Sequence, residues 1–269
     1  DVYKRQLIIC RLVIDEMDKN SVIIEQIDEI IKSNYVLLSK LMIKGELSQI
    51  GDNDSGRLFY SAFDEDAPLK MIWLLEIIRN LFQKSEFYQE EKKFTYEIKS
   101  TIPSFSNFQK VTHKKIKVFT KDYQSYCFKD FGIYIWRNDD EYFSIRCGPI
   151  GQNGIGGHSH YDQLSIECFT DNSWILRDPG TGTYTDDIAT RNKFRSLDYH
   201  WGPKAKIQFP KEDEFDCFKL NYMGDGKVLQ FDKYNFLGFA EFHGKRIYRK
   251  IKFNDGEVII EDFSNNADI

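Results

Sequence analysis

Three histidines and one aspartate between residues 156 and 200 form a group that could hold a metal ion. They are His158, His160, Asp178 and His200. Zn²⁺ readily takes imidazole nitrogens and carboxylate oxygens as ligands. Side chains two positions apart in an extended chain point to the same face, so we expect His158 and His160 to face one cavity and Ser159 to point away. This segment therefore indicates a Zn²⁺ site.

A β-hairpin would bring two of these residues together. Two apolar runs, one from 164 to 169 and one from 174 to 176, flank an Asp-Asn pair that favours a tight turn. Folding the chain back at this turn would return Asp178 to the end of the hairpin where His160 lies. His200 would need the longer loop between 179 and 199 to reach the same place.

The composition of the chain excludes several classes of protein. The net charge is −5 with acids and bases interspersed, and no basic block of the kind that neutralises phosphates is present, so no nucleic-acid partner is expected. Five widely spaced cysteines without a CxxC pair predict neither a disulfide framework nor a thiolate metal site, and we expect most of them to be buried.

The first apolar run, LIICRLVI, is short and interrupted by Arg11, so it predicts neither a signal peptide nor a transmembrane segment. The chain begins with Asp rather than Met, and we expect it to be part of a longer protein.

The hydrophobic period changes near residue 100. Apolar residues recur at three and four positions before this point, as in the isoleucines between 23 and 31, and this spacing predicts helices, with Gly45 as one stop. Residues 50–61 are dense in turn-forming residues and predict a charged loop that includes Asp52. A linker is expected around residues 101–104.

After residue 103 the apolar period becomes two. Eight short runs predict strands of an antiparallel sandwich: FGIYIWRN, EYFSIRCG, LSIECF, SWILRD, AKIQF, KVLQF, RIYRKIKF and EVIIEDF. The expected fold is therefore α+β and multidomain, with a helical segment over residues 1–100 and an antiparallel β-sandwich over residues 101–269.

Three sequence blocks resemble those of the heparinase II/III-like family of polysaccharide lyases. The family carries GHGHxDxLSF, DPGTYTY and RNYFRSTxAHNT, and this chain carries GGHSHYDQLSIE (156–167), DPGTGTYT (178–185) and RNKFRSLDYHWG (191–202) in the same order. The resemblance covers roughly residues 45–265 and is strongest over 130–200. It implies an α/α toroid, of which residues 1–100 would be the C-terminal part, followed by a β-sandwich, with an acidic polysaccharide bound between them.

The resemblance also implies an activity and roles for individual residues. The activity would be β-elimination at a uronic acid, as in lyases of glycosaminoglycan or alginate, by an enzyme of the bacterial cell envelope, periplasmic or secreted. His160, Asp178 and His200 match the family's zinc-binding residues, and His158 matches its active-site histidine. Tyr184 lies in the DPG block, where the family also has a tyrosine. The family's other catalytic groups lie upstream, in the toroid.

Each of these residues also has an alternative role. His158 could neutralise the substrate carboxylate or transfer a proton, or it could be a loop histidine bonded to backbone. Asp178 could only cap the Pro-Gly turn, and a metal could hold loops together without taking part in chemistry. Tyr184 could serve as acid or base, or only pack.

Three polar residues and two departures from the family blocks lie in the same region. Arg191, Asn192 and Arg195 are expected to bind the substrate carboxylate or to position the loop of residues 180–200, with a surface ion pair as the alternative. Two departures from the family blocks lie near the presumed site, namely Gly182 in place of a tyrosine and Trp201-Gly202-Pro203 after His200.

The function that these observations favour is that of a lyase acting on a uronic-acid-containing polysaccharide. The alternative is a non-catalytic, zinc-containing protein of the same fold that binds polysaccharide or assists capsule or envelope assembly. A zinc hydrolase would require a carboxylate base near the metal, and Asp162 and Glu167 are poor candidates because they belong to the strand pattern.

Overall fold

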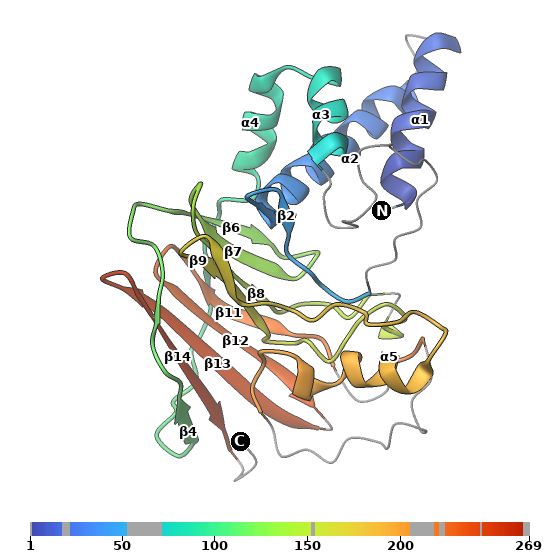
Figure 1. Ribbon diagram of the computed structural model, residues 1–269. Coiled ribbons are helices and arrows are strands. Elements are labelled where there is room, and N and C mark those ends of the chain that lie inside the picture. Colours follow the sequence, from blue (N-terminus) through green and yellow to red (C-terminus); the bar gives the residue numbers. More distant parts are fainter. Residues whose placement is uncertain are drawn as a thin grey trace. The chain divides into compact units, whose positions relative to one another are not determined.

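The computed structural model describes residues 2–17, 22–52, 72–151, 154–204, 218–220, 224–242 and 244–265 (Figure 1). The chain divides into two compact units, one formed by Asp1–Leu47 with Asp54–Thr95 and the other by Ser48–Asn53 with Tyr96–Ile269. Most of the expected loop of residues 50–61 and the whole expected strand AKIQF (205–209) lie outside the described residues.

The first unit is helical. Its elements are α1 (Val2–Met17), α2 (Val22–Leu41), the short strands β1 (Met42–Ile43) and β2 (Glu46–Leu47), α3 (Ile72–Leu81) and α4 (Lys84–Lys92). The apolar stripe of α2 packs Ile27, Ile31 and Leu38 into a core shared with the other helices, so the predicted helical period is confirmed here.

The predicted helix stop at Gly45 is wrong, because α2 ends earlier, at Leu41. Lys44 and Gly45 have φ values of 48° and 84° and instead form the turn between β1 and β2. A turn with positive φ at both central residues suits a two-residue hairpin, and glycine adopts that conformation without a steric penalty.

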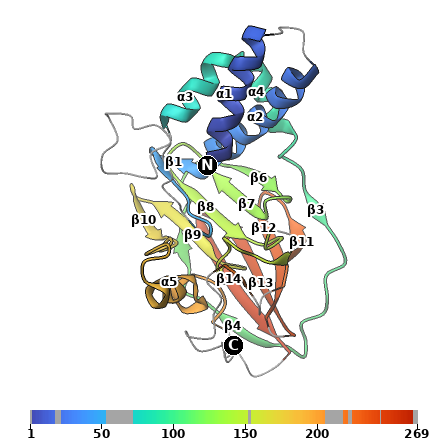
Figure 2. The ribbon, with the colours of Figure 1, turned by 90° about the vertical axis from the view of Figure 1, so that its right-hand side faces the viewer.

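The second unit contains two antiparallel sheets, seen as two layers in Figure 2. The five-stranded sheet has the order β10-β9-β8-β7-β6, with β6 (Gln124–Phe128), β7 (Ile133–Arg137), β8 (Tyr142–Arg146), β9 (Ile166–Thr170) and β10 (Ser173–Leu176). The larger sheet has the order β3-β11-β12-β13-β14-β4, and β5 also pairs with β14. Its strands are β3 (Ile98–Lys99), β4 (Gln109–Thr112), β5 (Ile116–Lys117), β11 (Lys227–Phe231), β12 (Asn235–Phe242), β13 (Lys245–Asn254) and β14 (Glu257–Ser264).

Aromatic side chains from both sheets form the core between them. The ring of Trp136 in β7 lies with its centroid 4.8 Å from that of Phe253 in β13 and 5.1 Å from that of Phe231 in β11. All three side chains are buried, and burial of aromatic surface of this size is a major stabilising contribution to a sandwich. The predicted antiparallel β-sandwich is confirmed.

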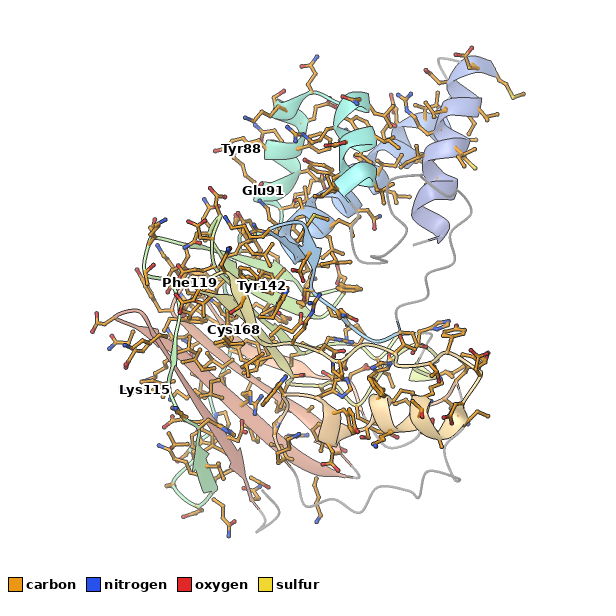
Figure 3. The ribbon with its side chains drawn as sticks, viewed as in Figure 1. Tyr88, Glu91, Lys115, Phe119, Tyr142 and Cys168 are labelled. Carbon is orange, nitrogen blue, oxygen red and sulfur yellow. The ribbon has the colours of Figure 1, made fainter. Side chains whose placement is uncertain are left out.

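The cysteines follow the expected pattern where the structure describes them. Cys127, Cys147 and Cys168 are buried and free, whereas Cys10 is free and exposed. Cys168 lies in β9 and is labelled in Figure 3. Cys217 is outside the described residues.

Two short helices follow β10. Helix α5 (Ile188–Arg195) begins after Asp187, whose side chain accepts a hydrogen bond from the backbone N–H of Thr190, a standard N-cap. A 3₁₀ turn, η2 (Leu197–Tyr199), comes directly before His200. No helix within the described ranges is both long enough and apolar enough to cross a membrane.

Candidate active site and metal centre

His160, Asp178 and His200 converge on one point inside the second unit. Each offers one ligand atom, and these three atoms lie within 4.8 Å of one another. Nδ1 of His160 is 3.3 Å from Nε2 of His200, which is 3.2 Å from Oδ2 of Asp178. Two ligands about 2.1 Å from a tetrahedral Zn²⁺ are separated by about 3.4 Å. The geometry therefore suits a small divalent ion.

The second nitrogen of each histidine is held by an acceptor, which fixes the tautomer of the ring. Nε2 of His160 donates to Oδ1 of Asp52 over 3.0 Å, and Nδ1 of His200 donates to the backbone carbonyl of Ser196 over 2.8 Å. The nitrogens that face each other are consequently the ones left with lone pairs in the neutral rings. This arrangement of outer acceptors is typical of metal-binding histidines.

A cation between these groups would relieve a strong repulsion. Two nitrogen lone pairs and the carboxylate of Asp178 point to the same small volume, and all three side chains are buried. Burial lowers the pKa of His200, but the hydrogen bond and charge of Asp178 outweigh this effect and raise the pKa overall. The centre therefore attracts either a proton or a metal ion.

The hairpin expected from the sequence positions Asp178. Strands β9 and β10 pair around Asp171 and Asn172, whose φ values of 50° and 62° form the tight turn. The expected positions Leu164, Ile166 and Phe169 are all buried. Helix α5 and η2 then return the chain so that His200 meets the other two ligands.

Asp52 is a central residue of the site that the sequence analysis placed only in a charged loop. Its two carboxylate oxygens accept from Nη1 and Nη2 of Arg191 at 2.8 Å and 2.7 Å, from Nε2 of His160 at 3.0 Å and from Nδ1 of His158 at 3.1 Å. These hydrogen bonds occupy all the acceptor sites of the carboxylate. One side chain thus links the candidate metal centre, α5 and the exposed histidine.

The environment of Asp52 keeps its carboxylate charged. Burial raises its pKa, but the hydrogen bonds and charges of His160 and Arg191 outweigh burial and hold the pKa well below its usual range. The preceding residue, Gly51, has a φ of 63°, and a Cβ there would lie 2.4 Å from the carbonyl oxygen of His158. Only glycine allows this close approach, which also includes a hydrogen bond from the Asp52 amide to the same carbonyl.

Glu167 is a second buried acid that supports the metal centre. Its carboxyl group accepts from the amide of Asp178 at 3.0 Å, from the amide of Gln49 and from the hydroxyl of Ser48. Burial, together with the charge of Asp178, raises the pKa of Glu167 to about 8. The residue therefore ties the segment after β2 to the backbone of one candidate ligand.

His158 and His160 do not share one cavity as expected. His160 is fully buried, whereas the side chain of His158 is 54% exposed. Ser159, which was expected to point away, lines the same pocket as His158. The expectation is wrong because this segment forms a turn rather than a strand, and the two imidazoles meet instead on opposite oxygens of Asp52.

Tyr184 lies beside His158. Its hydroxyl oxygen is 3.4 Å from Nδ1 of His158, and the two rings are nearly parallel with centroids 6.3 Å apart. The guanidinium carbon of Arg191 lies 5.2 Å from the centre of the Tyr184 ring and 5.0 Å from that of Phe218. These are cation–π distances, so the guanidinium group of Arg191 helps to hold the ring of Tyr184 in place.

Arg191, Asn192 and Arg195 are all buried, with exposed fractions of 0%, 2% and 1%. The alternative of a surface ion pair is therefore wrong. Arg195 donates from Nη2 to the backbone carbonyl of Lys219 and from Nη1 to the side-chain oxygen of Asn192. The backbone carbonyl of Arg195 also accepts from the amide of Tyr161. In this structure the three residues contact protein groups around the metal-binding loops.

The two departures from the family blocks have local structural reasons. Gly182 has a φ of 70°, and a Cβ at this position would lie 2.6 Å from the ring of Phe194. Trp201 donates from Nε1 to the carbonyl of Arg177, and its own carbonyl accepts from Arg249. Phe194 thus leaves no room for a side chain at position 182, and Trp201 is held by hydrogen bonds to Arg177 and Arg249.

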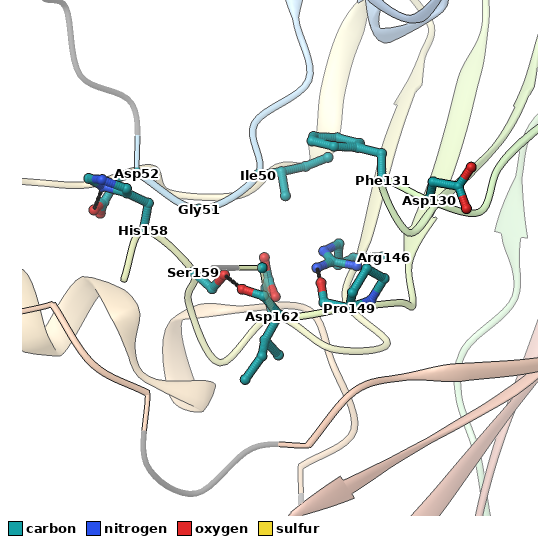
Figure 4. Close-up of a pocket in the computed structure, with 12 residues that line it drawn as sticks. Ile50, Gly51, Asp52, Asp130, Phe131, Arg146, Pro149, His158, Ser159 and Asp162 are labelled. Atoms are coloured by element: carbon teal, nitrogen blue, oxygen red, sulfur yellow. Dashed lines mark hydrogen bonds and ion pairs between the residues drawn. The ribbon is translucent and has the colours of Figure 1, made fainter. Parts of the chain in front are cut away.

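A pocket of about 260 Å³ opens beside His158. Figure 4 shows it between the segment that holds Ile50 and Asp52 and the turn that holds Ser159 and Asp162. Its position next to an exposed imidazole and a tyrosine hydroxyl makes this region the candidate active site.

The comparison with protein families gives one match. Residues 120–200 match the family model described as heparinase II/III-like, C-terminal. The matched range contains β6 to β10, the three candidate metal ligands and α5. The resemblance that the three sequence blocks indicate is therefore confirmed for this part of the chain.

Two solved structures of heparinase III are similar to the chain. One, with methylated lysines, has a TM-score of 0.49 and 15% identity over 91% of this chain and 32% of its own. The other has a TM-score of 0.43 and 16% identity over 90% of this chain and 34% of its own. The chain thus spans about a third of the length of these proteins. A comparison with curated proteins finds no match.

Proposed function

We propose that the chain belongs to a polysaccharide lyase that cleaves uronic-acid-containing polysaccharide by β-elimination. The observation that carries this proposal is the pairing of an exposed, Asp52-anchored His158 with the hydroxyl of Tyr184, at the rim of a pocket in the part of the chain that matches the family model. Elimination needs a positive or proton-donating group at the substrate carboxylate and a proton carrier near the reacting carbons.

His158 is suited to the first of these tasks. Asp52 accepts from its Nδ1, so the exposed Nε2 is the nitrogen available to substrate. A protonated ring can donate from Nε2 to the uronate carboxylate and offset the charge that develops when the adjacent carbon loses its proton. The carboxylate of Asp52, which accepts from Nδ1, holds the ring in this orientation.

Tyr184 is suited to the second task. In its ionised form the side-chain oxygen can take the proton from the carbon next to the carboxylate and then, as a phenol, give that proton to the glycosidic oxygen. In the balanced step the C–H bond and the bond to the glycosidic oxygen break, a C=C bond forms, and the leaving oxygen takes a proton. Arg191 holds the ring of Tyr184 at a fixed place relative to His158.

We propose that His160, Asp178 and His200 hold Zn²⁺. The support is the donor set, the spacing of the three ligand atoms and the outer acceptors on both histidines. When bound, Zn²⁺ would cross-link the loops that carry these residues and neutralise their lone pairs. Because the three side chains are buried, we assign the ion a structural role that positions Asp52, His158 and Tyr184.

Arg191, Asn192 and Arg195 fit the same scheme as positioning residues. Their burial and their bonds to protein groups support one of the two roles expected from sequence, namely positioning of the loop of residues 180–200. A role of Arg191 in substrate binding would be indirect. Its guanidinium group contacts the ring of Tyr184, and it shares the carboxylate of Asp52 with His158.

We further propose that the helical segment of residues 1–100 is the end of an α/α toroid and that residues 101–269 form the heparinase II/III-like sandwich. The packing of α1, α2, α3 and α4 around one apolar core supports the first part. The partner would be an acidic polysaccharide and the location the bacterial cell envelope, periplasmic or secreted, as the family match suggests.

The test is the ultraviolet absorbance of the unsaturated uronate that elimination produces. The chain, and any longer protein that contains it, would be incubated with heparin, heparan sulfate, alginate and other acidic glycans. We expect the chromophore with at least one polymer, and its loss in His158→Ala and Tyr184→Phe. Binding of a polymer without any chromophore would overturn the lyase proposal and favour the non-catalytic alternative.

A further inference from the structure

A buried arginine of the larger sheet contacts both segments that carry the candidate histidine ligands. Nη1 of Arg249, in β13, donates to the backbone carbonyl of Leu164 over 2.7 Å and to that of Trp201 over 2.6 Å. Leu164 lies shortly after His160 in the chain, and Trp201 directly follows His200. One guanidinium nitrogen therefore joins the segments of two candidate ligands that are 40 positions apart in the chain.

The backbone next to His200 is held at several points. The amide of Trp201 donates to Oγ of Ser165 over 3.0 Å, and its indole Nε1 donates to the carbonyl of Arg177 over 3.1 Å. The bond to Ser165 joins the same two segments that Arg249 joins. Because both backbone groups of Trp201 are hydrogen-bonded, the peptide unit that follows His200 has a fixed orientation.

Leu164 adopts a backbone conformation that depends on support from its neighbours. Its φ is 62°, in the left-handed region that residues with a side chain adopt rarely. Its amide donates to the carbonyl of Arg146 over 2.7 Å, and its own carbonyl accepts from Arg249. Such a conformation persists only where the surrounding structure determines it. The bond from Arg249 thus helps to fix the turn that follows His160.

Asp262 fixes the orientation of Arg249. The two residues are cross-strand neighbours in β13 and β14, and the carboxylate accepts from Nε at 2.7 Å and from Nη2 at 2.8 Å. Nε2 of His113, whose side chain is 35% exposed, also donates to Asp262 over 2.7 Å. Burial raises the pKa of Asp262, but the charge and hydrogen bonds of Arg249, together with those of His113, outweigh burial and lower the pKa. The charged carboxylate therefore binds one edge of the guanidinium group while Nη1 meets the two carbonyls.

We infer that Arg249 is a positioning residue for the proposed Zn²⁺ site, because it holds the segments of His160 and His200 at the separation that the ion requires. The inference rests on the proposed function and adds to it a residue of the larger sheet. Ligands supplied by separate loops bind a metal tightly when supporting hydrogen bonds hold them within about 0.5 Å of the required positions. Arg249 acts through the backbone next to the ligands.

Arg249→Lys tests this role because it keeps a positive charge beside Asp262. An ammonium group cannot reproduce the rigid fork that meets two carboxylate oxygens and two carbonyls at once. Phe253→Leu is the matched control, because it removes packing from the same strand, where the ring of Phe253 lies against Trp136 and Phe143 in the core between the sheets. Circular dichroism verifies that each variant is folded.

The first measurement is the Zn²⁺ affinity of the chain, by competition with a chromophoric chelator. We expect the Kd to rise about tenfold or more in Arg249→Lys and to stay within about twofold of the parent value in Phe253→Leu. If Arg249→Lys does not fold, His113→Ala decides the question. This milder change removes one partner of Asp262, and it should raise the Kd more than Phe253→Leu does.

Hydrogen exchange in the presence of chelator measures the positioning without the metal. The amides of Leu164 and Trp201 are both hydrogen-bonded, so their exchange reports opening of the two segments. Arg249→Lys should speed exchange of both amides severalfold relative to the amides of β6.

Two results would overturn the positioning role. One is unchanged exchange at Leu164 and Trp201, and the other is a Zn²⁺ affinity in the deciding variant no weaker than in Phe253→Leu. Failure of the proposed Zn²⁺ site looks different, because the unaltered chain would not bind Zn²⁺, or would bind it equally well after His160→Ala. That result would overturn the metal proposal and this inference together.

Discussion

Replacing Asp52 by asparagine tests whether one carboxylate connects the metal centre to the candidate catalytic residues. The substitution keeps the size of the side chain but removes its charge and half of its acceptor capacity. Arg191, whose side chain is 0% exposed, would lose its charged partner. Because His158 and His160 bond to opposite oxygens of Asp52, the amide would keep an acceptor for only one of the two rings.

The expected loss of stability follows from this burial. Removing one member of a buried ion pair costs about 3–5 kcal/mol, because the other charge stays uncompensated. Losing the outer acceptor of a metal-binding histidine weakens metal binding about 10- to 100-fold. We therefore expect Asp52→Asn to destabilise the second unit by about 3 kcal/mol or more and to bind Zn²⁺ at least about tenfold less tightly.

Urea unfolding with and without chelator, followed by circular dichroism, measures the first effect, and Zn²⁺ titration of the folded protein measures the second. Asp122→Asn is the matched control, because Asp122 pairs with Lys233 on the surface with its side chain 88% exposed. Such an exposed pair contributes little to stability, because solvent screens its charges. The double variant Asp52→Asn with Arg191→Met should recover part of the stability, since it removes the unpaired charge as well.

The dependence on pH has a definite sign. The pKa of Asp52 in the folded protein lies below the value of about 3.9 for an unfolded chain. Its contribution is therefore complete above about pH 4 and is lost as the pH falls toward the folded pKa. The stability difference between the unaltered protein and Asp52→Asn should shrink in acid. A loss no larger than that of Asp122→Asn at pH 7, with unchanged Zn²⁺ affinity, would refute the reasoning.

Three further predictions test the surroundings of Asp52. His160→Ala and His200→Ala should each abolish stoichiometric Zn²⁺ in metal analysis of the purified protein, and equal Zn²⁺ in variant and parent would exclude these ligands. Glu167 has a folded pKa of about 8, so in the presence of chelator the stability that depends on it should fall as the pH rises from about 4.3 toward 8. Glu167→Gln should flatten this slope in urea unfolding, and parallel profiles would contradict it. Gly51→Ala should lower the unfolding midpoint clearly more than Gly244→Ala, because both glycines have positive φ but only the first would place its Cβ against a backbone oxygen; equal losses would argue against the close approach.

The period of the apolar residues was enough to predict most elements of the sandwich. Short apolar runs bounded by turn-forming residues locate β7, β8, β9 and β10. Of these strands, β8 and β9 are buried at every position, and only β10 alternates in burial. The predicted runs do not include β3, β4, β5, β6 or β12. In β12, Gly238 interrupts the apolar run. The structure gives a reason for that glycine, since a Cβ there would lie 2.8 Å from the ring of Phe236 and 3.0 Å from the sulfur of Cys147.

The sequence by itself determined the donor chemistry and the hairpin that brings Asp178 to His160, because residue types and turn signals are local properties. Tertiary structure alone decided that Asp52, more than 100 positions away from His158 and His160, would accept hydrogen bonds from both rings. It also decided that His158 stays exposed while His160 is buried. Burial and long-range pairing depend on how separate segments pack, and no local pattern carries that information.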